Sequence, residues 1–137
     1  MTVSGGAVVA LNALIELRRA PTAPGVARRV VAGLLDGWGV RGPVLEDTAI
    51  VVNELVSNAV EHAGGEASLE LAVSRYGDLL RISLADPSPV HPVELRVDHR
   101  AARGRGVHLI AVLCRRWGAE AHRGGKRVWC EITLRSA

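Results

Sequence analysis

The sequence predicts an α+β fold, a two-layer α/β sandwich in which three helices cover one face of a sheet of about five strands. Helical and extended patterns follow one another in the order strand, helix, helix, two strands, long loop, helix, two strands. The strands come in adjacent pairs separated by short turns, which indicates hairpins and argues against a purely parallel sheet. A chain of 137 residues suits a single domain, which we take to span 1–137.

The first half of the chain is expected to form one strand and two helices. Residues 1–6 show no pattern and are expected to be disordered, whereas residues 7–20 favour extended structure and end at prolines. Residues 24–40 carry apolar side chains at three- and four-residue spacing and end at glycines, as an amphipathic helix does. The strongest helix is expected over 42–65, with a proline and acidic residues near its start and a glycine pair at its end.

The second half is expected to form two hairpins with a loop and a helix between them. Residues 67–75 and 79–86 alternate between apolar and polar side chains and are joined by a short turn. A proline-containing loop follows, and a helix opened by two glycines is expected over 104–118. The last hairpin is expected to join 119–123 to 127–135 through the turn Gly-Gly-Lys.

The composition limits the class of protein. With three Trp, one Tyr and no Phe, the core has to be built from Val, Leu, Ile and Ala. The net charge of +3 is mild, and the Arg-Arg pairs lack interleaved aromatic residues, so scattered solvated charge is favoured over a nucleic-acid groove. The longest apolar run is far shorter than the roughly 18 residues of a membrane span, and no leader pattern is present. We therefore expect a cytoplasmic protein that binds neither membrane nor nucleic acid directly.

The cysteines and histidines do not predict a metal site. Cys114 and Cys130 are far apart in the sequence, form no CxxC motif and lie in apolar patterns, so we expect free, buried thiols. The five histidines show neither HxxH nor HxxxH spacing.

The longest expected helix has a polar side that raises the question of a site. Glu54, Asn58 and His62 follow one another at one-turn spacing, opposite a broad apolar stripe. A solvated face is the ordinary explanation. Two features favour a site instead: Ile50 and Val51 interrupt the polar side, and an asparagine inside a helix costs about 0.5 kcal/mol relative to alanine. The pattern alone leaves both interpretations open.

Two further places could contact a ligand. Arg103, Gly104, Arg105 and Gly106 stand where the long loop becomes a helix, and free N–H groups at a helix N-terminus suit phosphate. An ordinary hinge is the alternative interpretation. Asp86 ends a strand, where its carboxylate could cap a turn or accept a hydrogen bond from the amino group of a ligand.

In order and spacing these stretches resemble the GHKL ATPase superfamily, which has the Bergerat fold of histidine kinase-like ATP-binding domains. Within it, the chain is most similar to the anti-sigma-factor serine/threonine kinases of bacteria. "NELVSNAVEH" resembles the N box, "LADPSP" the first glycine box, "GRGVHLIAVLCRRWG" the second, and "GKRVWCEI" the final strand. The similarity covers residues from about 20 to 135. It implies a mixed sheet with helices on one face, and ATP bound between the helices under a lid formed by residues 87–103.

The resemblance also implies a role for each matched residue. Glu54 would be the catalytic general base, and Asn58 would be the ligand of the Mg²⁺ ion that bridges the phosphates. Asp86 would bind the adenine amino group, and His62 would have a packing role. The residues expected to contact ATP are Asn58, Asp86, Gly104, Arg105 and Gly106.

The implied function is that of an ATP- and Mg²⁺-dependent protein kinase. Such relatives bind a sigma factor, phosphorylate a serine of an anti-anti-sigma partner of the STAS type, and commonly form homodimers. Two departures keep an alternative open. Asp86 is followed by Pro87 rather than by the pattern Asp-x-Gly-x-Gly, and Lys126 and Arg127 stand where the family often has a threonine. The alternative is a non-catalytic protein-binding regulator with weak or no nucleotide binding.

Overall fold

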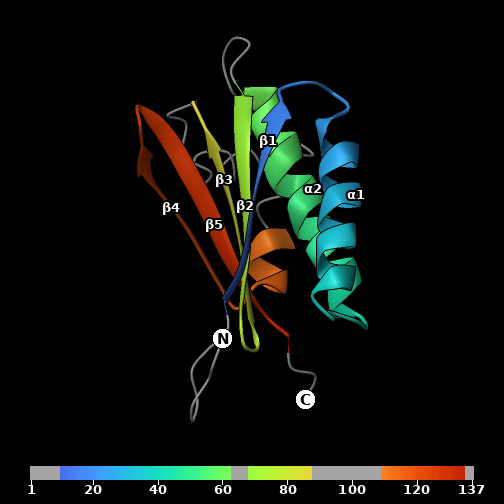
Figure 1. The fold of residues 1–137 in the computed structure, drawn as a ribbon. Coiled ribbons are helices and arrows are strands. Elements are labelled where there is room, and N and C mark those ends of the chain that lie inside the picture. The colour runs from blue at the N-terminus through green and yellow to red at the C-terminus, as the bar shows by residue number, and fades with distance from the viewer. Residues whose placement is uncertain (1–9, 63–67, 88–108, 135–137) are drawn as a thin grey trace.

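The fold was analysed in a computed structural model, which describes residues 10–62, 68–87 and 109–134. Figure 1 shows a sheet with the helices packed against one of its faces. A short helical segment, residues 109–113, lies on the same side of the sheet as the two long helices. The elements in chain order are β1 (Ala10–Arg18), α1 (Ala23–Gly37), α2 (Val44–His62), β2 (Ser68–Tyr76), β3 (Leu79–Asp86), β4 (Arg116–His122) and β5 (Gly125–Thr133).

The sheet has five strands in the order β1-β2-β3-β5-β4, which confirms the expected sandwich. All four neighbouring pairs are antiparallel, so the expectation of a mixed sheet was wrong. The reason is the place of β5. After β3 the chain passes through residues 109–113 and forms β4, which runs parallel to β3. Because β5 lies between β3 and β4, these two parallel strands do not pair with each other.

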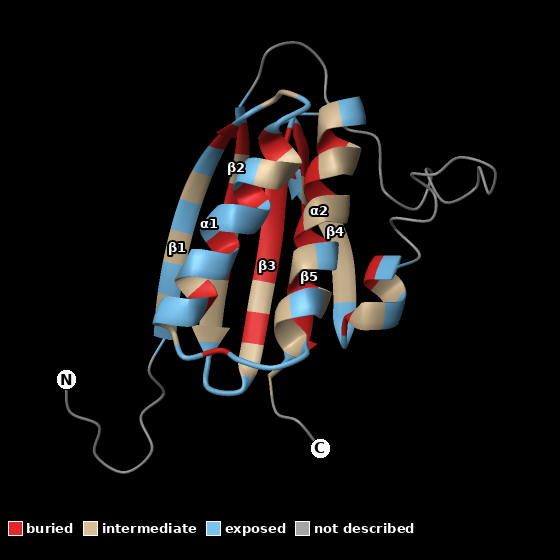
Figure 2. Ribbon diagram, turned by 90° about the vertical axis from the view of Figure 1, so that its right-hand side faces the viewer, coloured by how far each residue is buried: buried red, intermediate tan, exposed pale blue. Residues whose placement is uncertain are grey.

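The core lies between the sheet and the helices and contains no phenylalanine, as the composition requires (Figure 2). On α1 the buried positions recur every four residues, at Ala23, Ala27, Val31 and Leu35, whereas Val26 and Val30 are 37% and 38% exposed. The completely buried aliphatic side chains come from α2 and the central strands: Val51, Val52, Val56, Leu69, Leu71, Val73, Leu80 and Ile82.

The last hairpin differs from its prediction by its register. Its turn consists of Arg123 and Gly124, which have φ angles of 49° and 83°, rather than of Gly-Gly-Lys. Positive φ at both central residues is the geometry that suits a two-residue turn to the twist of a hairpin. As a result Gly125 and Lys126 belong to β5, and Lys126 is the residue opposite Asp86 on β3.

The third helix is shorter at its C-terminal end than predicted. It was expected to continue to residue 118, but the helical segment ends at residue 113 and β4 begins at Arg116. The backbone N–H of Arg115 already donates to the carbonyl oxygen of Glu131 at 2.8 Å. Sheet pairing with β5 therefore outweighs the helical pattern of the sequence "CRRWG".

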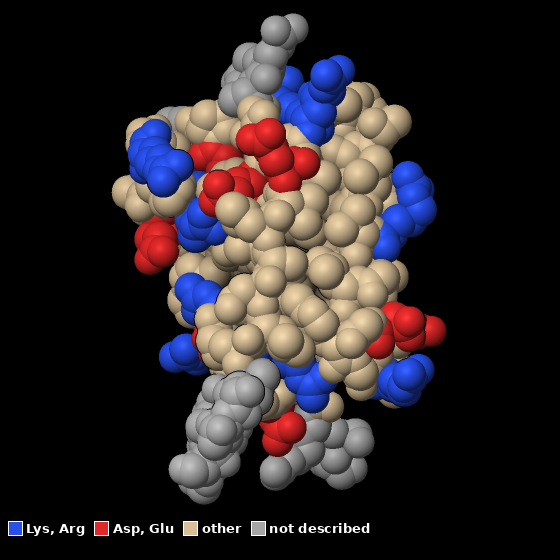
Figure 3. Space-filling view, in the orientation of Figure 1, with Lys and Arg blue, Asp and Glu red and all other residues tan. Residues whose placement is uncertain are grey.

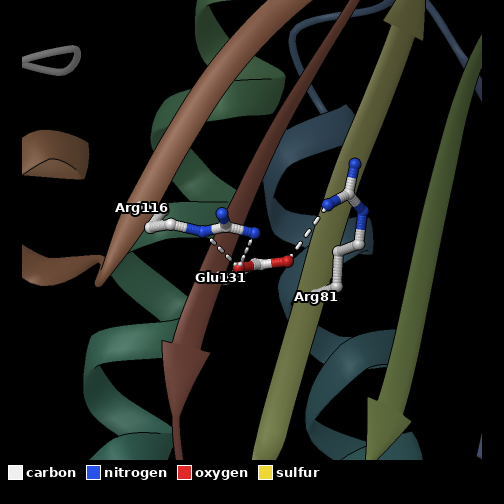
Figure 4. Close-up of polar contacts among 3 residues, drawn as sticks. All are labelled: Arg81, Arg116 and Glu131. Atoms are coloured by element: carbon white, nitrogen blue, oxygen red, sulfur yellow. Dashed lines mark hydrogen bonds and ion pairs between the residues drawn. The ribbon is translucent and has the colours of Figure 1, made fainter.

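The uncovered face of the sheet carries a network of charges. The side chain of Glu131 is only 8% exposed. Its carboxylate forms ion pairs with Arg116 and Arg81, with N···O distances of 2.8 Å and 3.2 Å (Figure 4). The guanidinium groups of Arg81 and Arg116 lie 4.5 Å and 5.6 Å from the centroid of the Trp129 ring. The three strands β3, β5 and β4 are thus linked across this face by ion pairs and cation–π contacts.

The prediction of free, buried thiols is confirmed. Cys114 is 9% exposed and Cys130 completely buried, and neither forms a disulfide. The hydrogen bond between the two thiols, together with burial, raises the pKa of Cys130 well above its ordinary value. Both effects favour the neutral thiol of Cys130 over the thiolate.

Candidate functional site

The polar side of α2 borders the core. Glu54 and Asn58 lie one turn apart and both side chains are half-buried. Val51, which is two turns before Asn58 on the same side of the helix, is completely buried. This burial agrees with the expectation that Val51 interrupts the polar side, whereas Ile50 is 40% exposed. A fully solvated helix face would not bury Val51, so this side of α2 is partly covered.

In the part of the chain that the structure describes, the carboxylate of Glu54 and the amide of Asn58 are not paired with neighbouring side chains. Within residues 10–62, 68–87 and 109–134, Glu54 has no ion pair and Asn58 has no side-chain hydrogen bond. Asn53 differs, because its Oδ1 accepts a hydrogen bond from Arg28 of α1. The two asparagines of α2 thus separate into one that joins the helices and one that is available to a ligand.

Asp86 is the last residue of β3, and this end of β3 lies at the same end of the sandwich as the C-terminal end of α2 (Figure 1). Asp86 is 6% exposed, and it lies on the helix-covered face, since Leu84, two residues earlier, is 1% exposed in the core. Lys126 is directly opposite on β5, and its Nζ atom donates to Oδ1 of Asp86 at 3.1 Å. With side chains that are 8% and 2% exposed, the two form a buried ion pair.

Gly125 brings the backbones of this site close together. A Cβ atom at Gly125 would lie 2.1 Å from the backbone oxygen of Asp86 and 2.6 Å from Cα of Pro87. Such distances exclude any side chain at this position unless the backbone shifts. Glycine is therefore required where β5 passes the end of β3.

Two cavities open beside this ion pair. One of about 210 Å³ has Asp86 and Pro87 in its wall, and one of about 420 Å³ has Lys126 in its wall. Both also include His122 and Arg123 from the end of the last hairpin. The smaller cavity also has Glu16 and Glu70 in its wall and so opens on the uncovered face of the sheet, whereas the larger one is lined by the last hairpin.

Several expected site residues lie outside the described ranges. They include the glycine-rich stretch with Gly104, Arg105 and Gly106, and nearly all of the expected lid at 87–103. His62 is the last residue of α2, but its side chain is not described. The structure therefore places Glu54, Asn58 and Asp86 on one side of the sheet and leaves the phosphate-binding stretch as a prediction.

The surface charges do not form a single patch on the visible face. Figure 3 shows the Lys and Arg side chains in separate places around the molecule, with Asp and Glu between them.

Among the described residues no cluster of three or more His, Cys, Asp or Glu side chains could hold a metal ion. The described helices also include none with the length and hydropathy to cross a bilayer.

Residues 17–132 match the family model of the histidine kinase-like ATPase domain. The chain belongs to this family. No individual curated protein gives a significant match. Membership of the histidine kinase-like ATPase family agrees with the sandwich architecture and implies that the domain binds ATP.

Little in the sequence indicates the Asp86–Lys126 pair. In the sequence, Lys126 differs from the family pattern only by standing where a threonine is frequent. One signal was present, because Lys126 is the single lysine among 17 basic residues. Its partner could not be predicted, since the pairing depends on the register of the last hairpin, which the sequence placed differently.

Proposed function

We propose that this histidine kinase-like ATPase domain is an ATP- and Mg²⁺-dependent protein serine kinase of the anti-sigma-factor type. It would bind a sigma factor and transfer phosphate to a serine of an anti-anti-sigma partner of the STAS type. The observation that carries the proposal is the arrangement on α2, where Glu54 and Asn58 are half-buried, one turn apart and uncommitted within the described ranges. The choice of kinase class and partners rests on the resemblance of the sequence.

The residues on this side of α2 fit a magnesium–nucleotide complex. Mg²⁺ prefers one or two protein oxygens and takes its remaining ligands from phosphates and water, so a dense cluster of acidic residues is not needed. The amide oxygen of Asn58 would supply one such ligand. The bound nucleotide provides the phosphoryl group and the metal ion that stabilises its charge during transfer.

Glu54 is the group that accepts the proton. Its carboxylate lies one helical turn from Asn58, within reach of a hydroxyl group that approaches the terminal phosphate. As the serine oxygen forms its bond to phosphorus and the bond to ADP breaks, Glu54 takes the hydroxyl proton. Because Glu54 has no cationic partner within the described ranges, its carboxylate is free to act as a base.

The experiment is a phosphotransfer assay with purified STAS-domain proteins as candidate acceptors and phosphoserine detected by mass spectrometry. Glu54→Gln should remove phosphotransfer while ATP binding stays close to that of the wild type. Glu46→Gln is the matched control, because Glu46 is exposed in the first turn of the same helix. Phosphotransfer by Glu54→Gln at the wild-type rate would reject the assigned base.

A second function is favoured by the Asp86–Lys126 pair. A carboxylate that is already paired with an ammonium group is a weaker acceptor for the amino group of adenine. This suits a regulator that binds partners without using ATP. This alternative predicts that the affinity for a partner is the same with and without Mg-ATP. The kinase proposal predicts that partner affinity changes with nucleotide.

A further inference from the structure

The Asp86–Lys126 pair is held in place by the sheet itself. The two residues are direct cross-strand partners on β3 and β5, and the close backbone approach at Gly125 fixes the distance between these strands. Both side chains extend from the helix-covered face, as their neighbours Leu84 and Val128 do. A carboxylate oxygen and an ammonium nitrogen are thereby held 3.1 Å apart at the end of the sheet, and Lys126 also lies in the wall of the cavity along the last hairpin.

Stability alone does not account for this pair. Replacing a buried ion pair by apolar side chains is often neutral or stabilising, because two charges must be removed from water. The chain also uses arginine everywhere else for its positive charges. Lysine differs from arginine by its compact ammonium group with three rotatable donors, which can serve two partners at once. Lys126 and Asp86 each have an interaction in addition to the hydrogen bond between them.

The chemistry of the pair matches one edge of adenine. On that edge the exocyclic amino group N6 is a donor, and the adjacent ring nitrogen N1 is an acceptor. The carboxylate of Asp86 offers acceptors beside the donors of Lys126, so the two sides are complementary without breaking the ion pair. A hydroxyl group at this position could both donate and accept, whereas the ammonium group can only donate.

We propose that Lys126 is a second base-reading residue, which donates a hydrogen bond to N1 of adenine while Asp86 accepts one from N6. This inference rests on the proposed ATP binding. On this proposal, lysine in place of the family's frequent threonine changes how adenine is recognised. The substitution then does not mean that ATP binding has been lost.

The test compares ATP with 1-deaza-ATP, in which the N1 atom is replaced by C–H, by calorimetric titration in the presence of Mg²⁺. The wild type should prefer ATP by roughly ten- to a hundredfold, which is the range for one well-placed pair of base contacts. Lys126→Met should lose most of this preference, because its side chain cannot donate. Arg127→Met is the matched control: its basic side chain leaves the same strand on the opposite face, where it binds Glu70 and Ser83.

The outcomes separate the possible errors. Both nucleotides are titrated into the same preparation, so partial unfolding of a variant affects both alike and leaves their ratio unchanged. Equal affinity of the wild type for ATP and 1-deaza-ATP would overturn the role of Lys126 while ATP binding itself stands, and this result needs no variant. A preference retained in Lys126→Met would overturn it as well. No binding of either nucleotide to the wild type would reject the proposed function together with this inference.

Discussion

Gly125 lies directly against the end of β3, since a Cβ atom there would stand 2.1 Å from the backbone oxygen of Asp86. Backbone atoms cannot turn aside as a flexible side chain can. We therefore expect Gly125→Ala to separate β3 from β5 and to lower the free energy of unfolding by about 1–3 kcal/mol. The same shift moves Asp86 away from Lys126, so ATP binding should weaken too. Urea unfolding and calorimetric titration measure the two effects.

Gly33→Ala is the control for this substitution. Gly33 is exposed on α1, and a Cβ atom there meets nothing within 4 Å. Because alanine favours a helix over glycine, the free energy of unfolding should rise by up to about 1 kcal/mol, with ATP binding unchanged. If Gly125→Ala were as stable as the wild type, the contact with Asp86 would be looser than the structure shows.

The ion pairs of Glu131 should contribute more than an exposed pair does. Glu131→Gln keeps the shape of the side chain but removes the charge that holds Arg81 and Arg116. We expect the free energy of unfolding to fall by about 1–3 kcal/mol, because the Glu131 side chain is 8% exposed. The comparison is Asp36→Asn, whose pair with Arg41 has both side chains 77% exposed and should matter by less than about 0.5 kcal/mol. Equal losses would contradict the role of burial.

Cys130 should make stability fall in alkaline solution. Its pKa is raised in the folded state by the hydrogen bond with Cys114 and by burial, so the unfolded state loses its proton first. Above the ordinary thiol pKa of about 8.5 the unfolded state binds fewer protons, and stability declines with pH by up to ~1.4 kcal/mol per unit. Unfolding free energies measured from pH 7 to 10 should fall more steeply for the wild type than for Cys130→Ala. Parallel curves would show that the thiol ionises equally in both states.

Much of the fold could be predicted because each strand and helix carries its own pattern. Alternation located β3 at residues 79–86 without error, and the acidic first turn located the start of α2. The errors concern pairing between distant segments. Glu131 draws Arg115 and Arg116 into sheet contacts, and this tertiary preference cannot be read from the local sequence.

The candidate site was predictable to a different degree. The one-turn spacing identified Glu54 and Asn58, because helical periodicity is a local property. Lys126 was not predicted as a site residue, because the sequence pattern placed it in the turn Gly-Gly-Lys, whereas the hairpin closes at Arg123 and Gly124. Lys126 thereby joins β5 opposite Asp86, and this pairing is not a local property of the sequence.

The central claim is that the polar side of α2 binds ATP through Mg²⁺. Its most direct test is calorimetric titration of the purified protein with ATP, with and without Mg²⁺, for the wild type, Asn58→Ala and the control Asn53→Ala. Asn53 is also half-buried on α2, but it faces Arg28 of α1. We expect ATP binding that requires Mg²⁺, is lost in Asn58→Ala and persists in Asn53→Ala. Absence of binding by the folded wild type, or equal binding by Asn58→Ala, would contradict it.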